Sequence, residues 1–289
     1  MRGVALCALA AIGINATVAV GPADVSMVTA SQSYMPPAAA NPLYNPAVAS
    51  VLPNRGQVVG VAHPVVVRFN SPVADKRAAE RAIDIKSAPA MTGKFEWLED
   101  DVVQWVPDRF WPAHSAVALS VGGMSTNFAT GAAVIGVASI SDHTFTVTID
   151  GLDAGPSSQL PAPHHRPHWG KPGVFPASMG RPEYPTPVGT YTVLAKERDV
   201  IMDSSSVGIP VDAPDGYLLD VDYAVRFTAR GLFVHSAPWA VNSLGYDNVS
   251  HGCVGLSTED AEWYFNTVNV GDPVIVHENS IEVPRTVSG

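Results

Sequence analysis

Cysteine is scarce in this chain: only Cys7 and Cys253 occur among its 289 residues. Cys7 lies in an N-terminal segment with the pattern of an export signal, so the mature chain would keep one cysteine and could not form an internal disulfide. A single thiol is then a reactive group, a metal ligand or an intermolecular bridge. Residues 250–252 before Cys253 read Ser-His-Gly, and His235 lies upstream, which favours a reactive thiol.

Positive charge is also sparse. Lys and Arg number 17 against 27 Asp and Glu, which gives a formal net charge of −10. Because no basic stripe is available to neutralise phosphates, the composition argues against a nucleic-acid partner. Charged residues make up 15% of the chain and apolar residues 46%, so there is enough apolar material for a core and little sign of global disorder.

Long hydrophobic runs are lacking beyond the N-terminus. The one long run covers residues 4–20, follows Arg2 and ends before small residues. Residues 1–23 are therefore predicted to be a signal peptide. An uncleaved membrane anchor is the rival, since about 17 apolar residues lie near the lower limit for crossing a bilayer. Both alternatives predict an exported protein of the periplasm or cell wall, and the second tethers it to the outer face of the plasma membrane.

The first half of the chain divides by composition. Residues 24–53 are rich in Pro, Ala and Ser and are predicted to be an extended linker. Residues 54–130 contain short apolar runs between turn residues, which predicts an antiparallel β-sandwich that serves as a spacer or interaction module. Trp97, Trp105 and Trp111 could form a carbohydrate-stacking platform, but a sandwich core is the favoured interpretation.

The second half is predicted to be a catalytic domain over residues 131–278, followed by a C-terminal tail over 279–289. Short strand patterns dominate it. One helix is expected after Ser257, a good N-cap followed by carboxylates, with apolar residues at helical spacing up to Val268. The predicted fold class is therefore mainly β: a sandwich followed by a β-rich domain with one prominent helix.

A stretch rich in Pro, Gly and His spans residues 152–174. His164, His165 and His168 could bind a metal, but partners at structural-site spacing are missing. A solvated loop is the favoured interpretation, and no metal is predicted there.

The chemistry of the chain is expected around Cys253. His235 ends an apolar strand, and fourteen residues of loop composition separate it from the Ser-His-Gly-Cys motif. His235 could act as general base for the thiol, while the N–H groups of Gly252 and Cys253 could stabilise an oxyanion. The residues alone leave two alternatives open: an inert buried thiol, or a zinc site formed with His235, His251 and Asp247.

Further motifs surround this thiol in one order along the chain. They are residues 178–182 (SMGRP), 185–191 (PTPVGTY), 202–208 (MDSSSVG), 233–239 (FVHSAPW) and 250–253 (SHGC). Together they resemble the L,D-transpeptidase (YkuD-type) catalytic domain of bacterial cell-wall enzymes. The whole chain is similar to actinobacterial, mycobacterial-type members with an immunoglobulin-like domain ahead of the catalytic domain.

The resemblance implies an acyltransferase that forms 3→3 crosslinks in peptidoglycan without a cofactor. Cys253 would attack the carbonyl of the third stem residue of a donor tetrapeptide, a diaminopimelate, and release D-alanine. His235 would activate the thiol, protonate the leaving amine and later deprotonate the side-chain amine of the acceptor stem. The implied partners are donor and acceptor stem peptides, together with carbapenem inhibitors that acylate Cys253.

The resemblance also implies roles for neighbouring residues. Roles in orienting the base or shaping the catalytic loop are implied for Ser236, Ser250, His251 and Gly252. Substrate-binding roles are implied for Met202, Tyr217, Gly231, Trp239 and Gly255. Gly255 departs from the family pattern, which usually has Asn or Arg there, so a side chain that could contact the donor stem is missing.

Two alternatives to transpeptidation use the same region. An L,D-carboxypeptidase would employ Cys253 and His235 with water in place of the acceptor amine. A non-catalytic wall-binding protein with a degenerate site is the other, supported by Gly255 and opposed by the intact Ser-His-Gly-Cys motif.

Overall fold

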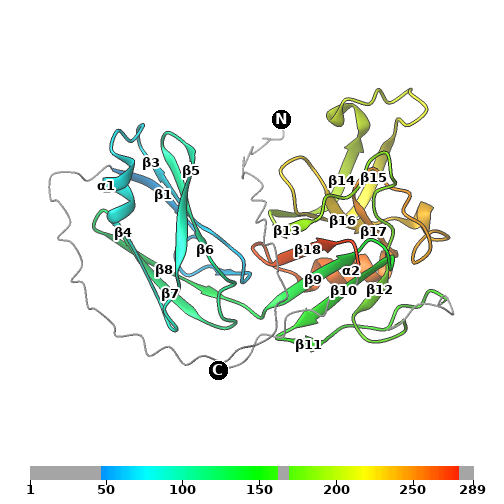
Figure 1. The fold of residues 1–289 in the computed structure, drawn as a ribbon, viewed down its shortest axis with the longest axis horizontal. Helices are drawn as coiled ribbons and strands as arrows, with labels where there is room; N and C mark the ends of the chain where they lie inside the picture. Colours follow the sequence, from blue (N-terminus) through cyan, green and yellow to red (C-terminus); the bar gives the residue numbers. More distant parts are fainter. Residues whose placement is uncertain (1–46, 162–168, 280–289) are drawn as a thin grey trace, which may run out of the picture.

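The computed structural model describes residues 47–161 and 169–279, which form two β-rich units in succession (Figure 1). Strands β1 to β8, drawn in blue to green, make the first unit, and strands β9 to β18, drawn in green to red, make the second. The predicted signal or anchor, residues 24–46 of the predicted linker, the three histidines at 164, 165 and 168, and residues 280–289 of the predicted tail lie outside the described residues.

The first unit is a sandwich of two four-stranded sheets. Their strand orders are β1-β3-β6-β5 and β2-β8-β7-β4, and a short helix, α1, precedes β4. The elements are β1 (Val48–Leu52), β2 (Val58–Val59), β3 (Val65–Phe69), α1 (Lys76–Arg81), β4 (Ile83–Ser87), β5 (Gly93–Glu99), β6 (Val102–Pro107), β7 (Ala116–Val121) and β8 (Met124–Thr130). The prediction of a β-sandwich is confirmed, whereas the linker boundary at residue 53 lies too late, because β1 pairs with β3 and belongs to the sandwich.

The three tryptophans of this unit belong to its core. Trp105 and Trp111 are buried with their ring centroids 5.3 Å apart, and Trp97 packs on the same apolar cluster while its indole N–H donates to Glu80. Burying rings of this size supplies much of the apolar area of a small sandwich. The core interpretation therefore holds over that of a sugar-stacking platform.

The second unit has a six-stranded and a four-stranded sheet. The first has the order β11-β10-β9-β18-β13 with β12 paired to β10, and the second has the order β14-β15-β16-β17. The elements are β9 (Val134–Ser139), β10 (Thr144–Ile149), β11 (Leu152–Asp153), β12 (Val174–Pro176), β13 (Gly189–Thr192), β14 (Ala195–Asp203), β15 (Leu218–Arg226), β16 (Phe233–Ser236), β17 (Val254–Leu256), α2 (Thr258–Thr267) and β18 (Pro273–His277), with short 3₁₀ turns η1 (Ser204–Val207) and η2 (Pro238–Ala240).

Helix α2 is the helix expected from the sequence. The Ser257 hydroxyl accepts the N–H of Asp260 at 3.1 Å, which caps the helix as predicted. The face with Ala261 and Tyr264 is buried against the core, where Tyr264 meets Phe145 edge to face at 4.8 Å. Because α2 packs on β15 and β16, it supports the sheet that carries His235. Among the described residues, no helix is long and apolar enough to cross a membrane.

The two units meet through backbone hydrogen bonds. The N–H groups of Gly60 and Ala62 donate to the carbonyls of Val270 and Gly271 at 2.9 and 2.7 Å. Between them, the N–H of Val61 donates to the carboxylate of Asp272 at 3.3 Å. Asp272 is fully buried, and burial raises the pKa of its carboxyl to about 7 although backbone N–H groups donate to it. The junction therefore contains a titratable group.

Candidate active site

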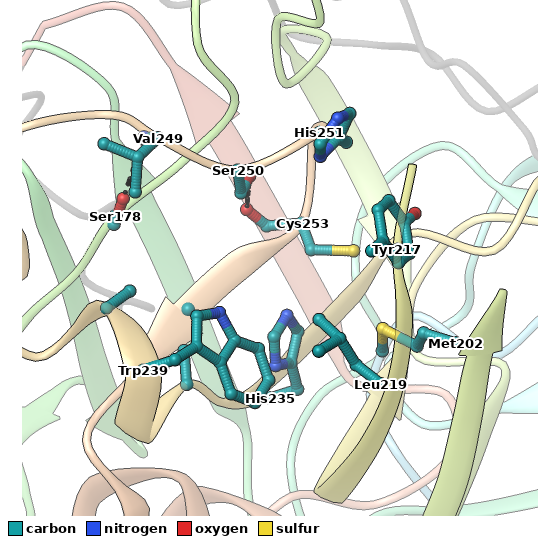
Figure 2. A pocket seen from close by; sticks show the side chains of 13 residues that line it. Ser178, Met202, Tyr217, Leu219, His235, Trp239, Val249, Ser250, His251 and Cys253 are labelled. Atoms are coloured by element: carbon teal, nitrogen blue, oxygen red, sulfur yellow. Dashed lines mark hydrogen bonds between the residues drawn. The ribbon is translucent and has the colours of Figure 1, made fainter. Parts of the chain in front are cut away.

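A parallel strand pair brings the histidine and the cysteine to one pocket. Strand β16 ends with His235 and Ser236, and Cys253 directly precedes β17, which pairs in parallel with β16 in the register His235 to Gly255. All four side chains of β16 are buried, as expected for an apolar strand covered on both faces. Figure 2 shows His235, Tyr217 and Cys253 around this pocket.

His235 is buried and neutral at neutral pH. Its Nδ1 lies 2.8 Å from the carbonyl of Ser236 and donates to it, which leaves Nε2 as the basic nitrogen. Burial lowers the pKa of His235 to about 4. The indole of Trp239 stacks on the imidazole with centroids 5.9 Å apart and covers it on the solvent side, where Trp239 is 52% exposed.

Cys253 is a free thiol that is partly exposed at the pocket. Burial of the sulfur raises the pKa of Cys253 to about 11, and a backbone hydrogen bond from Phe233 and the charge of Arg226 oppose that rise less strongly. Within the described residues, no hydrogen bond joins Sγ to His235. The resting pair is therefore a thiol and a neutral imidazole rather than an ion pair.

Residues 250–253, which form the catalytic loop, are held together by hydrogen bonds of Ser250. The Ser250 hydroxyl donates to the carbonyl of Cys253 at 2.7 Å and accepts the N–H of Gly252 at 3.0 Å. Ser250 thus holds the loop and does not contact His235. Since the Gly252 N–H is already bonded, it must leave Ser250 before it can serve an oxyanion, whereas the sequence favoured Gly252 and Cys253 equally as donors.

His251 is held in an aromatic and cationic cluster at the other end of the pocket. A guanidinium nitrogen of Arg181 lies 3.1 Å from Nε2 of His251, and the rings of Tyr184 and Tyr217 lie 4.7 and 4.9 Å away. Burial and the positive charge of Arg181 lower the pKa of His251. His251 therefore joins the loop to its surroundings as a neutral ring, and Arg181 also pairs with Asp215.

The pocket has a volume of about 200 Å³. Its lining includes eight of the residues predicted for the site: Met202, Tyr217, His235, Trp239, Ser250, His251, Cys253 and Gly255. Ser236, Gly252 and Gly231 do not line it. The Ser236 hydroxyl instead bonds Thr258 at 2.9 Å, and Gly231 lies in the turn before β16 with φ +91°.

Gly255 is a wall of the pocket at a point of close packing. A Cβ added there would lie 2.9 Å from the Cβ of Ala237, so a larger residue requires Ala237 to move. The absence of a side chain at this position therefore reflects a close approach between β17 and the segment after β16.

Several residues of the site were missed from the sequence. Ser178, Leu219, Ala237, Ala240 and Val249 also line the pocket. Asn248 anchors the loop: its Oδ1 accepts the N–H of Met179 at 2.9 Å and its Nδ2 donates to the carbonyl of Ile140 at 3.1 Å. Ser178 and Met179 were visible inside a recognised motif, but no local pattern marked Asn248.

The zinc alternative requires several ligands together. Over residues 47–161 and 169–279, no group of three or more His, Cys, Asp or Glu side chains is placed to hold a metal ion. The guanidinium of Arg181 beside His251 also opposes a cation at that ring.

A neutral imidazole on β16 and a thiol directly before the adjacent parallel strand β17, facing one open pocket, are the arrangement of a cysteine-dependent acyl-transfer site. Residues 28–124 match the bacterial Ig domain family, and residues 167–276 match the L,D-transpeptidase catalytic domain family. The chain is 68% identical to the probable L,D-transpeptidase 3 of Mycobacterium tuberculosis, over 96% of this chain and 100% of that protein.

Solved structures agree with this assignment. The crystal structure of L,D-transpeptidase 3 from Mycobacterium tuberculosis with a faropenem-derived adduct has 73% identity and a TM-score of 0.73, over 80% of this chain and 98% of that one. The structure of LD transpeptidase LdtMt1 with imipenem has 51% identity and a TM-score of 0.72, over 80% and 99%. The chain therefore belongs to the L,D-transpeptidase family. The predicted function, that of a peptidoglycan L,D-transpeptidase, and the predicted fold class are confirmed.

Proposed function

We propose that Cys253 and His235 carry out the two acyl transfers that form a 3→3 crosslink. The observation that supports this most directly is their placement on a parallel strand pair, both facing one open pocket. In the first transfer Sγ attacks the carbonyl of the third stem residue while Nε2 of His235 takes the thiol proton. The imidazolium then gives that proton to the amine of the departing D-alanine, which leaves a thioester.

The second transfer reverses the proton path. The side-chain amine of the acceptor stem attacks the thioester carbonyl, His235 accepts its proton, and the thiol leaves with that proton. Because burial disfavours both charged forms, proton transfer and attack occur together, and a standing thiolate–imidazolium pair is not needed.

Binding roles follow from the pocket. Met202, Tyr217 and Trp239 contact the stems, with Tyr217 at the side toward which the thiol points (Figure 2). Gly255 lines the pocket with its backbone, so the donor stem meets no side chain at this position. Ser250 and His251 act by holding the catalytic loop through the contacts described above.

β-Lactams are proposed to acylate Cys253. The relatives described above were solved with a faropenem-derived adduct and with imipenem, and a strained lactam carbonyl offers Sγ the same kind of electrophile as the donor amide. Exposure to imipenem should raise the intact mass by one adduct, and Cys253→Ala should remove it.

The test of the full reaction uses disaccharide-tetrapeptide and mass spectrometry. Crosslinked dimer with loss of D-alanine supports transpeptidation. Tripeptide without dimer would show that water replaces the acceptor amine, as in a carboxypeptidase. Absence of any product and of any acylated thiol would contradict the proposal.

The location is proposed from the N-terminal segment. Residues 1–23 would direct export and, if retained, tether the enzyme to the outer face of the plasma membrane. Fractionation with N-terminal sequencing of the recovered protein tests this, and recovery from the cytoplasm with an intact N-terminus would overturn it.

A further inference from the structure

The peptide group before the nucleophile is held from outside its loop by a threonine. The hydroxyl of Thr186 donates to the carbonyl of Gly252 at 2.9 Å and accepts the N–H of Gly180 at 2.8 Å. Thr186 is 2% exposed, so water does not replace either bond. It is not among the residues that line the pocket.

This bond has a geometric consequence at Cys253. The carbonyl of Gly252 and the N–H of Cys253 belong to one planar trans peptide group, so they point in opposite directions. A hydroxyl that fixes the carbonyl on one side therefore fixes the direction of the Cys253 N–H on the other. The same hydrogen bond also fixes the position of the peptide group that leads into Cys253.

The backbone here needs such support. Gly252 has φ +114°, a region that is accessible to glycine and is one of several that glycine visits freely. Its N–H is bound by Ser250 and its carbonyl by Thr186, so both peptide groups around it are held. Pro185 and Pro187 flank Thr186 and restrict its own backbone, which makes the hydroxyl a fixed point.

Residues 180–186 pack closely against the loop that contains Gly252. A Cβ added to Gly180 would lie 2.9 Å from the Cα of Gly252 and closer still to the backbone of Tyr184 and Thr186. The segment from Gly180 to Thr186 therefore lies directly against the catalytic loop.

We propose that Thr186 is a positioning residue for acyl transfer, acting through the Gly252 carbonyl to direct the Cys253 N–H at the oxygen that becomes negative when Sγ attacks. This inference rests on the proposed role of Cys253. An N–H directed in advance stabilises a developing oxyanion without reorganisation, which is where such donors contribute most to rate.

Three variants isolate the hydroxyl. Thr186→Val keeps the shape and removes both hydrogen bonds, while Thr186→Ser keeps the hydroxyl and loses the methyl group. Thr148→Val is the matched control, because Thr148 is a buried threonine of the same unit whose hydroxyl has no partner among the described residues. If Thr186→Val does not fold, Thr186→Ala removes the same hydroxyl with a smaller side chain.

Two reactions of the same thiol separate positioning from general damage. Acylation by imipenem builds an oxyanion, whereas alkylation by iodoacetamide does not. We expect Thr186→Val to lower the acylation rate constant by about 10-fold or more and to change the alkylation rate constant by less than about threefold. With tetrapeptide substrate, kcat should fall more than KM rises, and Thr186→Ser should stay within about threefold of the parent in every assay.

Each outcome bears on the inference. Acylation by Thr186→Val at the parental rate would overturn it, as would an equal loss of acylation and alkylation. Thr186→Ser as slow as Thr186→Val, or Thr148→Val slowed to the same degree, would also count against a role for this hydroxyl. If the parent enzyme itself is not acylated at Cys253, the proposed function fails instead.

Discussion

The two β-rich units bury polar groups very differently. Of the buried polar and charged residues in the described part of the chain, three lie in the sandwich (His63, Gln104 and Thr130) and thirteen in the second unit. Buried polar groups are costly without partners, so a fold concentrates them where they are needed. In the second unit many of them surround the catalytic loop, including Ser178, Thr186 and His235.

The difference teaches where the chemistry and the stability of this enzyme lie. The sandwich has an apolar core around Trp105 and Trp111. The second unit has an apolar core of similar kind but leaves a thiol and an imidazole at the margin of a sheet. Side chains also join the units: Asp272 accepts the N–H of Val61, and Asp150 contacts His114 of the sandwich at 2.9 Å.

The largest expected effect is confined to the second unit. Cys253→Ala should lower crosslinking by at least about 1000-fold and abolish the imipenem adduct, because Cys253 supplies the proposed attacking thiol. Intact-mass analysis and product mass spectrometry measure this. A residual adduct on the alanine variant would place the nucleophile elsewhere.

A core substitution in the sandwich should lower stability and leave acylation unchanged. Leu119→Ala removes a buried side chain of β7 and should lower the free energy of unfolding of the sandwich by about 2–5 kcal/mol. The imipenem acylation rate of the folded protein should be unchanged. Urea denaturation measures the loss of stability, and stopped-flow kinetics at low temperature measures the acylation rate. A loss of acylation that parallels the loss of stability would show that the two units are not independent.

The rate of acylation should depend on pH through the fraction of enzyme in which His235 and Cys253 are both uncharged. The rate constant should be level from about pH 5 to 9 and fall about tenfold per pH unit once the pH drops below the pKa of His235, near 4, because imidazolium cannot accept the thiol proton. Circular dichroism at each pH verifies that the fold persists. A midpoint near the ordinary histidine pKa of about 6.5 would contradict the effect of burial.

The smallest effect concerns the junction. Since the folded-state pKa of Asp272 is raised to about 7, the folded state binds this proton more tightly than the unfolded state, and the contribution of Asp272 to stability is greatest at low pH. The contribution of Asp272 to the free energy of unfolding should fall by at most about 1.4 kcal/mol per pH unit as pH rises from about 4 to 7 and then level off, while buried His235 contributes an opposite slope over about pH 4 to 6.5. Asp272→Asn, which mimics the protonated form, should remove this slope. An unchanged slope would assign it to another group.

Much of the fold could be predicted from local patterns. One of the short apolar runs noted in residues 54–130 forms strand β3 (Val65–Phe69), and the N-cap at Ser257 marks the start of α2. Strand β1 was assigned to the linker because its sequence is rich in Ala and Pro on either side, and its pairing with β3 is a long-range contact. Strand β15 alternates exposed Asp220 and Asp222 with buried Val221 and Tyr223, whereas β14 carries charged residues and shows no clear alternation.

The site also combines residues that local sequence patterns predicted with residues that only long-range contacts reveal. Met202 and Tyr217 reached the pocket as the resemblance implied, whereas Gly231 did not. Asn248 carried no local signal, and Thr186 stood in a recognised motif whose pattern did not reveal its contact with the Gly252 carbonyl, because both residues bond backbone groups more than 60 residues away in the chain.

The sequence by itself determined the family and predicted Cys253 and His235 as nucleophile and base, because these residues and the motifs around them are local patterns of residue type and spacing. Tertiary structure alone decided that the thiol and the imidazole rest uncharged, that Ser250 bonds its own loop, and that Thr186 holds the Gly252 carbonyl. The physical reason is that burial and hydrogen-bond partners depend on which distant segments the fold brings together, and these set both the pKa values and the direction of each backbone group.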